Sequence, residues 1–175
     1  MKTILTVIHS NLIILILAIF LPTCLLAQKI EIGEKGVSIN SILIKNENDV
    51  NQALGSPTKK ALFQSSTKGG YWEYPEIGLT VYFREEQNVK NCDLMISYKT
   101  FTGEVFVGKR KLDRETHMYK LLQYDELKFN PIEIGSFPND PSKFAQFIGA
   151  KCFGKDASFT YDRPDAIGIL SIDLY

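Results

Sequence analysis

The sequence predicts an α+β fold, in which an antiparallel β-sheet meander carries short helices on one face and two halves of the chain are related. Three observations lead to this prediction. Several segments have apolar residues at every second position, polar turns separate them, and only a few short segments have helical spacing. The chain has 175 residues, 45% of them hydrophobic and 23% charged, which suits one compact domain and excludes a disordered chain.

Residues 1–27 have the pattern of a secretory signal. Lys2 supplies the positive start, Leu12–Leu21 is an unbroken apolar run, and Ala27 is the small residue before the expected cut. We therefore expect cleavage after Ala27 and an exported, periplasmic or secreted protein. Two alternatives remain open: an uncleaved segment that anchors the chain in a membrane, and a lipid anchor on Cys24.

The next segment predicts short strands followed by one helix. β-branched residues alternate from Lys29 to Lys45, at Ile30, Ile32, Val37, Ile39, Ile42 and Ile44. Asn46 then follows as a helix N-cap, and Gly55 with the proline two residues later predicts the stop. A helix this short must pack against a sheet to be stable.

Four further strands predict the antiparallel meander. Residues 59–70 are expected to form a loop, and strands are expected at residues 71–74, 79–83, 92–99 and 104–107. The intervening segments 75–78 and 84–91 have turn composition. Short turns of this kind join antiparallel neighbours.

The rest of the chain predicts a mixture of strands and short helices. Residues 116–123 favour either a helix capped by Thr116 or part of a strand, and strands are expected at 127–129, 132–134, 158–161 and 167–174. Asp140-Pro141 predicts the start of a helix, because a proline is favoured at the first helical position. Phe144, Phe147 and Ile148 would form its apolar stripe, and Gly149 its end.

Short matches in the same order predict an internal duplication. The helix Val50–Gly55 is matched to Phe144–Gly149, and the strands Gly36–Ile39 and Leu94–Ile96 are matched to Gly103–Val107 and Ile172–Leu174. We therefore expect residues 28–112 to form a first half and residues 113–175 a second, diverged half of one compact domain.

The first half also resembles known families. The capped helix is followed by Leu54-Gly55-Ser56-Pro57, then by Tyr71-Trp72-Glu73-Tyr74 and Gly78–Phe83. This order resembles the repeat unit of β-lactamase-inhibitor-type proteins and of small outer-membrane assembly lipoproteins of the SmpA/OmlA type. The added segment Phe101–Val105 resembles an uncharacterised family of exported bacterial domains of unknown function. The resemblance implies a non-enzymatic protein that binds another protein through its sheet face.

The expected contact residues are aromatic and lie on one hairpin. Trp72, Tyr74 and Tyr82 offer large contact areas at modest entropic cost, as interface residues do. The alternative is that Trp72 and Tyr74 pack beneath the helix. We expect a partner protein of unknown identity, no cofactor, and a membrane contact only if the N-terminal segment stays uncleaved.

Cysteine and histidine counts limit the chemistry of the mature chain. Cys92 and Cys152 can form one disulfide or remain two buried thiols, and the sequence favours neither alternative. His117 is the sole histidine after residue 27, and with Asp113 and Glu115 it makes a poor metal-ligand set. A solvated turn or helix start explains this cluster better, so no metal is expected.

An enzymatic alternative is a small envelope hydrolase that uses carboxylates. Asp162 with Asp165, or Glu85 with Glu86, would act as acid and base. Both pairs lie in polar segments, where solvated acids are usual, so we expect no enzyme. Nucleic-acid binding is disfavoured as well, because 20 basic residues balance 20 acidic ones and Lys109-Arg110-Lys111 is the lone basic run.

Overall fold

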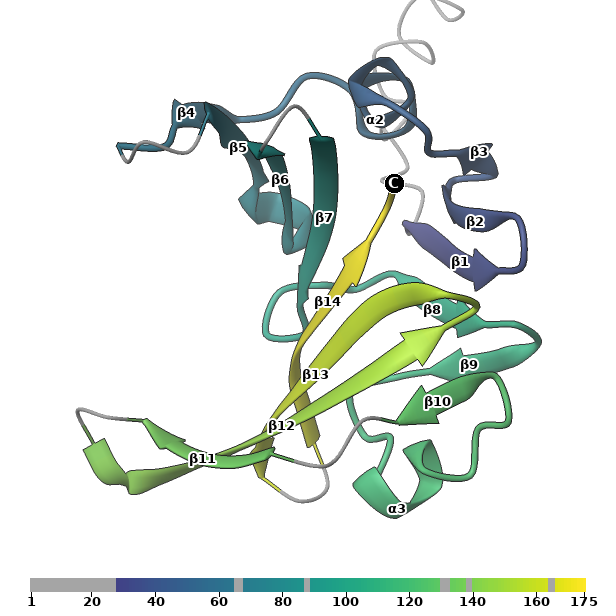
Figure 1. Cartoon of the computed structure of the whole chain (residues 1–175), viewed down its shortest axis with the longest axis vertical. Coiled ribbons are helices and arrows are strands. Elements are labelled where there is room, and N and C mark those ends of the chain that lie inside the picture. The colour runs from purple at the N-terminus through teal and green to yellow at the C-terminus, as the bar shows by residue number, and fades with distance from the viewer. Residues whose placement is uncertain (1–27, 65–67, 87–88, 130–132, 138–139, 164–165) are drawn as a thin grey trace, which may run out of the picture.

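The structure, a computed structural model, describes residues 28–64, 68–86, 89–129, 133–137, 140–163 and 166–175. Two β-sheets pack face to face around one hydrophobic core, and a short helix covers one end of the pair (Figure 1). Most strand pairs are antiparallel. The predicted signal segment, residues 1–27, lies outside the described residues.

The first sheet has five short strands. In chain order they are β1 (Lys29–Gly33), β2 (Gly36–Ile39), β3 (Ile42–Leu43), β8 (Glu104–Val107) and β9 (Arg110–Leu112), and in space their order is β3-β2-β1-β8-β9. Asn40 and Ser41 make the turn between β2 and β3 with φ angles of 51° and 68°, which fits a two-residue hairpin turn. β1 and β8 are parallel, and the other pairs are antiparallel.

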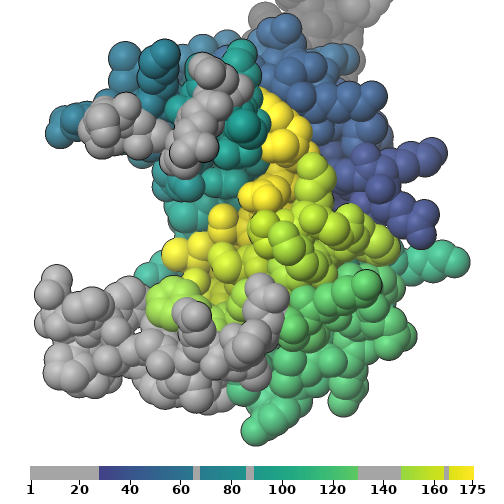
Figure 2. All heavy atoms as spheres, in the orientation of Figure 1, coloured from purple at the N-terminus to yellow at the C-terminus, as the bar shows by residue number. Residues whose placement is uncertain are grey.

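The second sheet is much larger. Its strands are β4 (Lys59–Leu62), β5 (Lys68–Tyr74), β6 (Leu79–Glu86), β7 (Val89–Ser97), β10 (Leu127–Phe129), β11 (Glu133–Phe137), β12 (Asp140–Cys152), β13 (Lys155–Arg163) and β14 (Ala166–Asp173). Their spatial order is β10-β12-β13-β14-β7-β6-β5-β4, with β11 also paired to β12. On the face seen in Figure 2, yellow β14 lies between the teal and the green strands. The sheet thus joins both halves of the chain.

Helix α2 (Glu47–Leu54) lies at the end of the two sheets, between β1–β3 and β5–β7 (Figure 1). The Asn46 side chain accepts hydrogen bonds from the backbone N–H groups of Asn48 and Asp49, as the sequence predicted for an N-cap. Gly55 ends the helix with a φ of 75°. Val50 is fully buried and attaches the helix to the core.

Two shorter helical turns complete the fold. The 3₁₀ turn η1 (Pro75–Ile77) joins β5 to β6, and Gly78 leaves it in the left-handed region with a φ of 67°. Helix α3 (Met118–Leu121) follows β9, and its N-cap is His117 instead of the predicted Thr116. Thr116 is buried, and its hydroxyl bonds to the Asp113 carboxylate.

The core contains the alternate side chains of both sheets. Fully buried residues of the first sheet include Ile30, Val37, Ile39 and Val105, and those of the second sheet include Leu94, Ile96, Ile148, Phe159, Leu170 and Ile172. The period-two spacing in the sequence therefore marks the face that is removed from water. The strands predicted at residues 79–83, 92–99 and 167–174 are confirmed as β6, β7 and β14, although β7 ends at Ser97 and β14 at Asp173.

Three local predictions are wrong. Residues 59–62 and 68–70, expected in a loop, form β4 and the start of β5. The polar segment expected as a turn at 84–91 includes the ends of β6 and β7. β8, expected as the fourth strand of the meander, pairs with β1 in the other sheet, and β14 takes the place beside β7.

The helix predicted from Asp140-Pro141 is also wrong, because residues 140–152 form the long strand β12. Ile148, Ala150 and Cys152 are buried at alternate positions, and seven residue pairs join β12 to β13. Pairing on both sides and burial of these alternate residues stabilise the strand more than a short local helix could be stabilised. The helix match that supported an internal duplication is therefore absent.

Candidate functional site

The outer face of the second sheet is the face of β4–β7 and β14 that points away from the core. Three aromatic side chains meet there, and we call Phe63, Tyr71 and Tyr82 the aromatic patch. The ring centroids lie 6.0 Å apart for Tyr71 and Tyr82, and 6.2 and 6.5 Å from Phe63 to the two tyrosines. All three residues are half-buried. The sheet register produces this cluster, because Tyr71 stands directly opposite Tyr82 on antiparallel strands.

Charged side chains border the aromatic patch on two sides. Lys59 Nζ lies 3.3 Å from the Glu73 carboxylate and 5.5 Å from the centre of the Tyr71 ring. The hydrogen bond that the Lys59 ammonium group donates to the Glu73 carboxylate raises the pKa of Lys59. Arg84 lies over the Tyr82 ring, with its Cζ 5.7 Å from the ring centre. Each tyrosine of the patch therefore has a cation close to its ring.

An acidic pair extends the same row of residues across the sheet. Asp93 lies opposite Tyr82 on one side, and on the other side it lies opposite Asp173 of β14. Arg84 Nη1 is 3.5 Å from an Asp93 oxygen. Burial and the neighbouring Asp173 carboxyl raise the pKa of the Asp93 carboxyl to about 6, because both disfavour the charged form of Asp93.

The predicted contact residues lie on two different faces. Tyr82 belongs to the outer face, whereas Tyr74 is buried, and its hydroxyl donates to the Gly55 carbonyl at 3.2 Å. Trp72 points to the same inner face as Tyr74, is half-buried, and packs on Phe83 with ring centroids 4.6 Å apart. Tyr74 therefore packs beneath the helix end, as the alternative interpretation held. Phe63, Tyr71 and Asp93 were missed, since their proximity depends on cross-strand register.

Cys92 and Cys152 are free thiols in the structure, and both are buried. They lie on β7 and β12, with β13 and β14 between them. Three strand spacings correspond to about 14 Å along a sheet, which exceeds the Cα separation that a disulfide allows. Burial raises the pKa of each thiol to about 12.

The other candidate groups have structural partners or lie apart. His117 Nδ1 accepts the Tyr119 N–H in the N-cap of α3, and the described residues contain no group of three or more ligands fit for a metal ion. Asp162 on β13 and Glu85 on β6 stand near opposite ends of the second sheet by strand register. Asp165 and the Glu86 side chain lie outside the described residues. These carboxylates make no pair in the described part of the structure.

The basic run also has local partners. Arg110 contacts Asp125 and Glu126, and Lys111 bonds to Glu104 at 2.9 Å.

Within the ranges given above, no helix is long and apolar enough to cross a bilayer. Comparisons with protein-family models, with curated proteins and with solved structures each found no match.

Proposed function

We propose that this chain is an exported, non-enzymatic protein-interaction module whose contact surface is the aromatic patch and its bordering charges. The observation that supports the proposal most is the mutual contact of three half-exposed rings on the outer face of a sheet. Tyrosine is enriched at protein interfaces because it supplies contact area at low entropic cost. The same side chains contribute little to the core, whose residues lie on the opposite face.

The arrangement of charges around the patch also supports a protein partner. Lys59, Glu73, Arg84 and Asp93 form two ion pairs at the rim of the aromatic patch. An apolar centre within a polar rim is the usual anatomy of a protein interface. A partner surface with an apolar centre and charges at its rim would exchange these ion pairs for contacts across the interface.

A second candidate function rests on the acidic pair. A carboxyl with a raised pKa beside a second carboxyl, as Asp93 lies beside Asp173, is typical of acid–base catalysis. The pair lies on the same open sheet face as the aromatic patch, whereas enzyme sites are concave. Hydrolase activity that disappears in Asp93→Asn, while Asp162→Asn stays active, would favour the enzyme over the interaction module.

Photo-crosslinking in the native host tests the proposal. The photoreactive residue p-benzoylphenylalanine replaces Phe63 in one variant and Tyr119 in a control variant, since Tyr119 is 67% exposed and belongs to α3. We expect one adduct of defined mass at position 63 and none at position 119. Adding Tyr71→Ser and Tyr82→Ser should remove the adduct. Equal labelling at both positions, or no adduct at position 63, would contradict the proposal.

A further inference from the structure

The strand β4 is the last strand of the nine-stranded sheet, and it pairs with β5 on one side only. The Phe63 N–H donates to the Gly69 carbonyl at 3.1 Å. Backbone groups alternate in direction along an antiparallel strand, so those of Lys59, Ala61 and Phe63 face β5. The backbone N–H and C=O groups of Lys60 and Leu62 therefore face the open edge. A row of open donors and acceptors of this kind is a template for another strand.

An apolar cavity of about 280 Å³ lies beside this edge on the inner face of the sheet. The side chains of Leu62, Trp72 and Phe83 line it. Gly69 and Gly70 also line it, and because they have no side chains they leave space in the cavity. A Cβ atom at Gly70 would collide with the backbone carbonyl of Ala61. Leu62 is 82% exposed, the highest value among the exposed large hydrophobic residues that the structure describes. The cavity has room for one apolar side chain of a strand that pairs with the open edge of β4.

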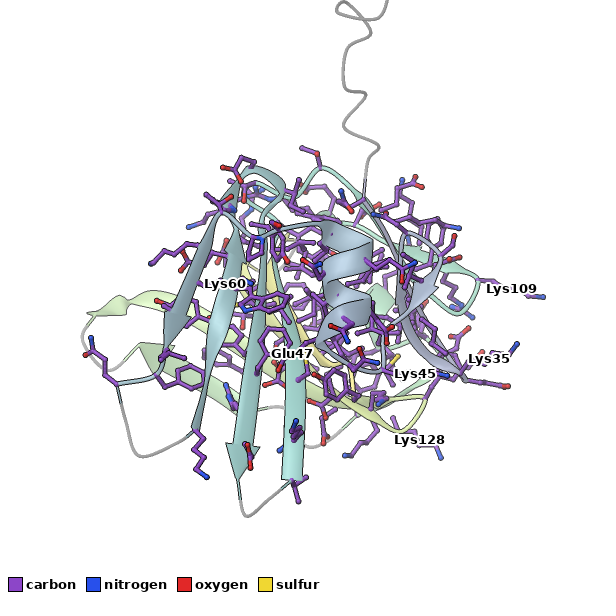
Figure 3. The ribbon with its side chains drawn as sticks, turned by 90° about the horizontal axis from the view of Figure 1, so that it is seen from above. Lys35, Lys45, Glu47, Lys60, Lys109 and Lys128 are labelled. Atoms are coloured by element: carbon purple, nitrogen blue, oxygen red, sulfur yellow. The ribbon has the colours of Figure 1, made fainter. Side chains whose placement is uncertain are left out.

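The same cavity has one charge of each sign at its border. Lys60 Nζ lies 4.3 Å from the centre of the Trp72 ring, and Glu47 lines the cavity from the start of α2. In the view of Figure 3, Lys60 and Glu47 lie between the strands and the helix. Lys59, on the outer face, already pairs with Glu73. Lys60 is therefore the cation that a chain added at the edge would meet.

From the open backbone, the cavity and the lysine we infer that β4 binds an extended peptide strand of a partner protein. This strand carries an apolar side chain over Gly70 and an acidic side chain two positions away, beside Lys60. The spacing of two follows from the pleat, which puts alternate side chains on one face. A second copy of this chain is a less favourable partner than such a peptide. If two β4 strands paired with each other, Lys59 and Lys60 of one copy would lie near the same lysines of the other, and these like charges repel.

The inference goes beyond the proposed function because it uses another surface, so each can fail alone. Its test uses protein expressed from the full sequence and a capped eight-residue peptide of threonines, with one leucine and one glutamate two positions apart. In an NMR titration to millimolar peptide we expect the Lys60 and Leu62 amide signals to shift and to become protected from hydrogen exchange. The Phe63 amide, which already donates to Gly69, is the internal control.

A charge exchange tests the acidic position. Lys60→Glu should weaken binding of the glutamate peptide about fivefold and should favour a peptide with lysine in its place. Leu62→Pro removes one outward N–H and should abolish binding, while Leu62→Ala should only weaken it. An unchanged preference in Lys60→Glu would overturn the inference, as would unshifted Lys60 and Leu62 amides or a dimer through β4 in sedimentation. The Tyr82→Ser variant, whose residue does not line the cavity, should bind the peptide normally.

Discussion

Asp93 and Asp173 stand directly opposite each other on β7 and β14, and burial together with the Asp173 carboxyl raises the pKa of Asp93. Asp93 therefore favours its protonated state in the folded chain, although Arg84 on its other side opposes this effect. Acidic conditions should stabilise this part of the sheet.

The first prediction concerns pH. The folded pKa of Asp93, about 6, lies above the usual value of about 4 for an unfolded aspartate. The contribution of Asp93 to the free energy of unfolding is therefore complete below about pH 4, where its carboxyl is protonated. This contribution is lost as the pH rises through about 6. Asp93→Asn removes this loss, so at pH 8 the variant should be about 1–2 kcal/mol more stable than the natural protein. Urea unfolding at pH 5 and pH 8 measures the difference.

The control for this experiment is Asp125→Asn, since the Asp125 side chain is 93% exposed. This change should leave the pH dependence of unfolding as it is in the natural protein. If Asp93→Asn and the natural protein lose the same stability between pH 5 and pH 8, the raised pKa of Asp93 is refuted.

The second prediction concerns the two buried thiols. Because Cys92 and Cys152 are free and their pKa values are raised to about 12, iodoacetamide should modify neither in the folded protein at pH 8. Both should react once urea unfolds the chain. Intact-mass spectrometry measures the labelling, and a reductant should not change the unfolding midpoint. A protein two hydrogens lighter than the reduced chain would show that a disulfide exists after all.

The third prediction concerns Gly78, which ends η1. Its φ is 67°, and a Cβ atom there would lie 2.6 Å from both Phe101 N and Thr100 Oγ1. Gly78→Ala should therefore destabilise the protein by about 1–3 kcal/mol, through backbone strain and close contact. Gly33→Ala is the matched control, since its Cβ would meet nothing within 4 Å. Thermal unfolding that shows equal losses for both variants would speak against this explanation.

The fourth prediction compares two buried tyrosines. The Tyr161 hydroxyl donates to the Thr116 carbonyl at 3.0 Å, whereas the buried Tyr98 hydroxyl has no hydrogen-bond partner among the residues described. Tyr161→Phe should therefore cost about 1 kcal/mol. Tyr98→Phe removes a hydroxyl that is buried without a hydrogen bond to compensate for its desolvation. The free energy of unfolding should therefore stay the same or rise. Urea unfolding of the two variants checks the order, and a larger loss for Tyr98→Phe would reverse it.

Local chemistry was enough to predict several elements from the sequence. Asn46 and Gly55 mark the ends of α2 because their side chain and backbone act within one turn of the helix. The strands at residues 79–83 and 167–173 were also predictable, since alternate burial depends on neighbouring residues alone. The turn predicted at residues 75–78, which ends at Gly78, belongs to the same group.

Only the tertiary structure decided which segments pair and what the outer face presents. Phe144, Phe147 and Ile148 have helical spacing, yet β12 is a strand because seven of its residues pair with β13. Likewise, Tyr71 and Tyr82 become neighbours only through the register of β5 with β6, and Asp93 meets Asp173 across strands far apart in the chain. Contacts of this kind depend on loop closure and on competition among many strands, and neither is encoded in any short stretch of residues.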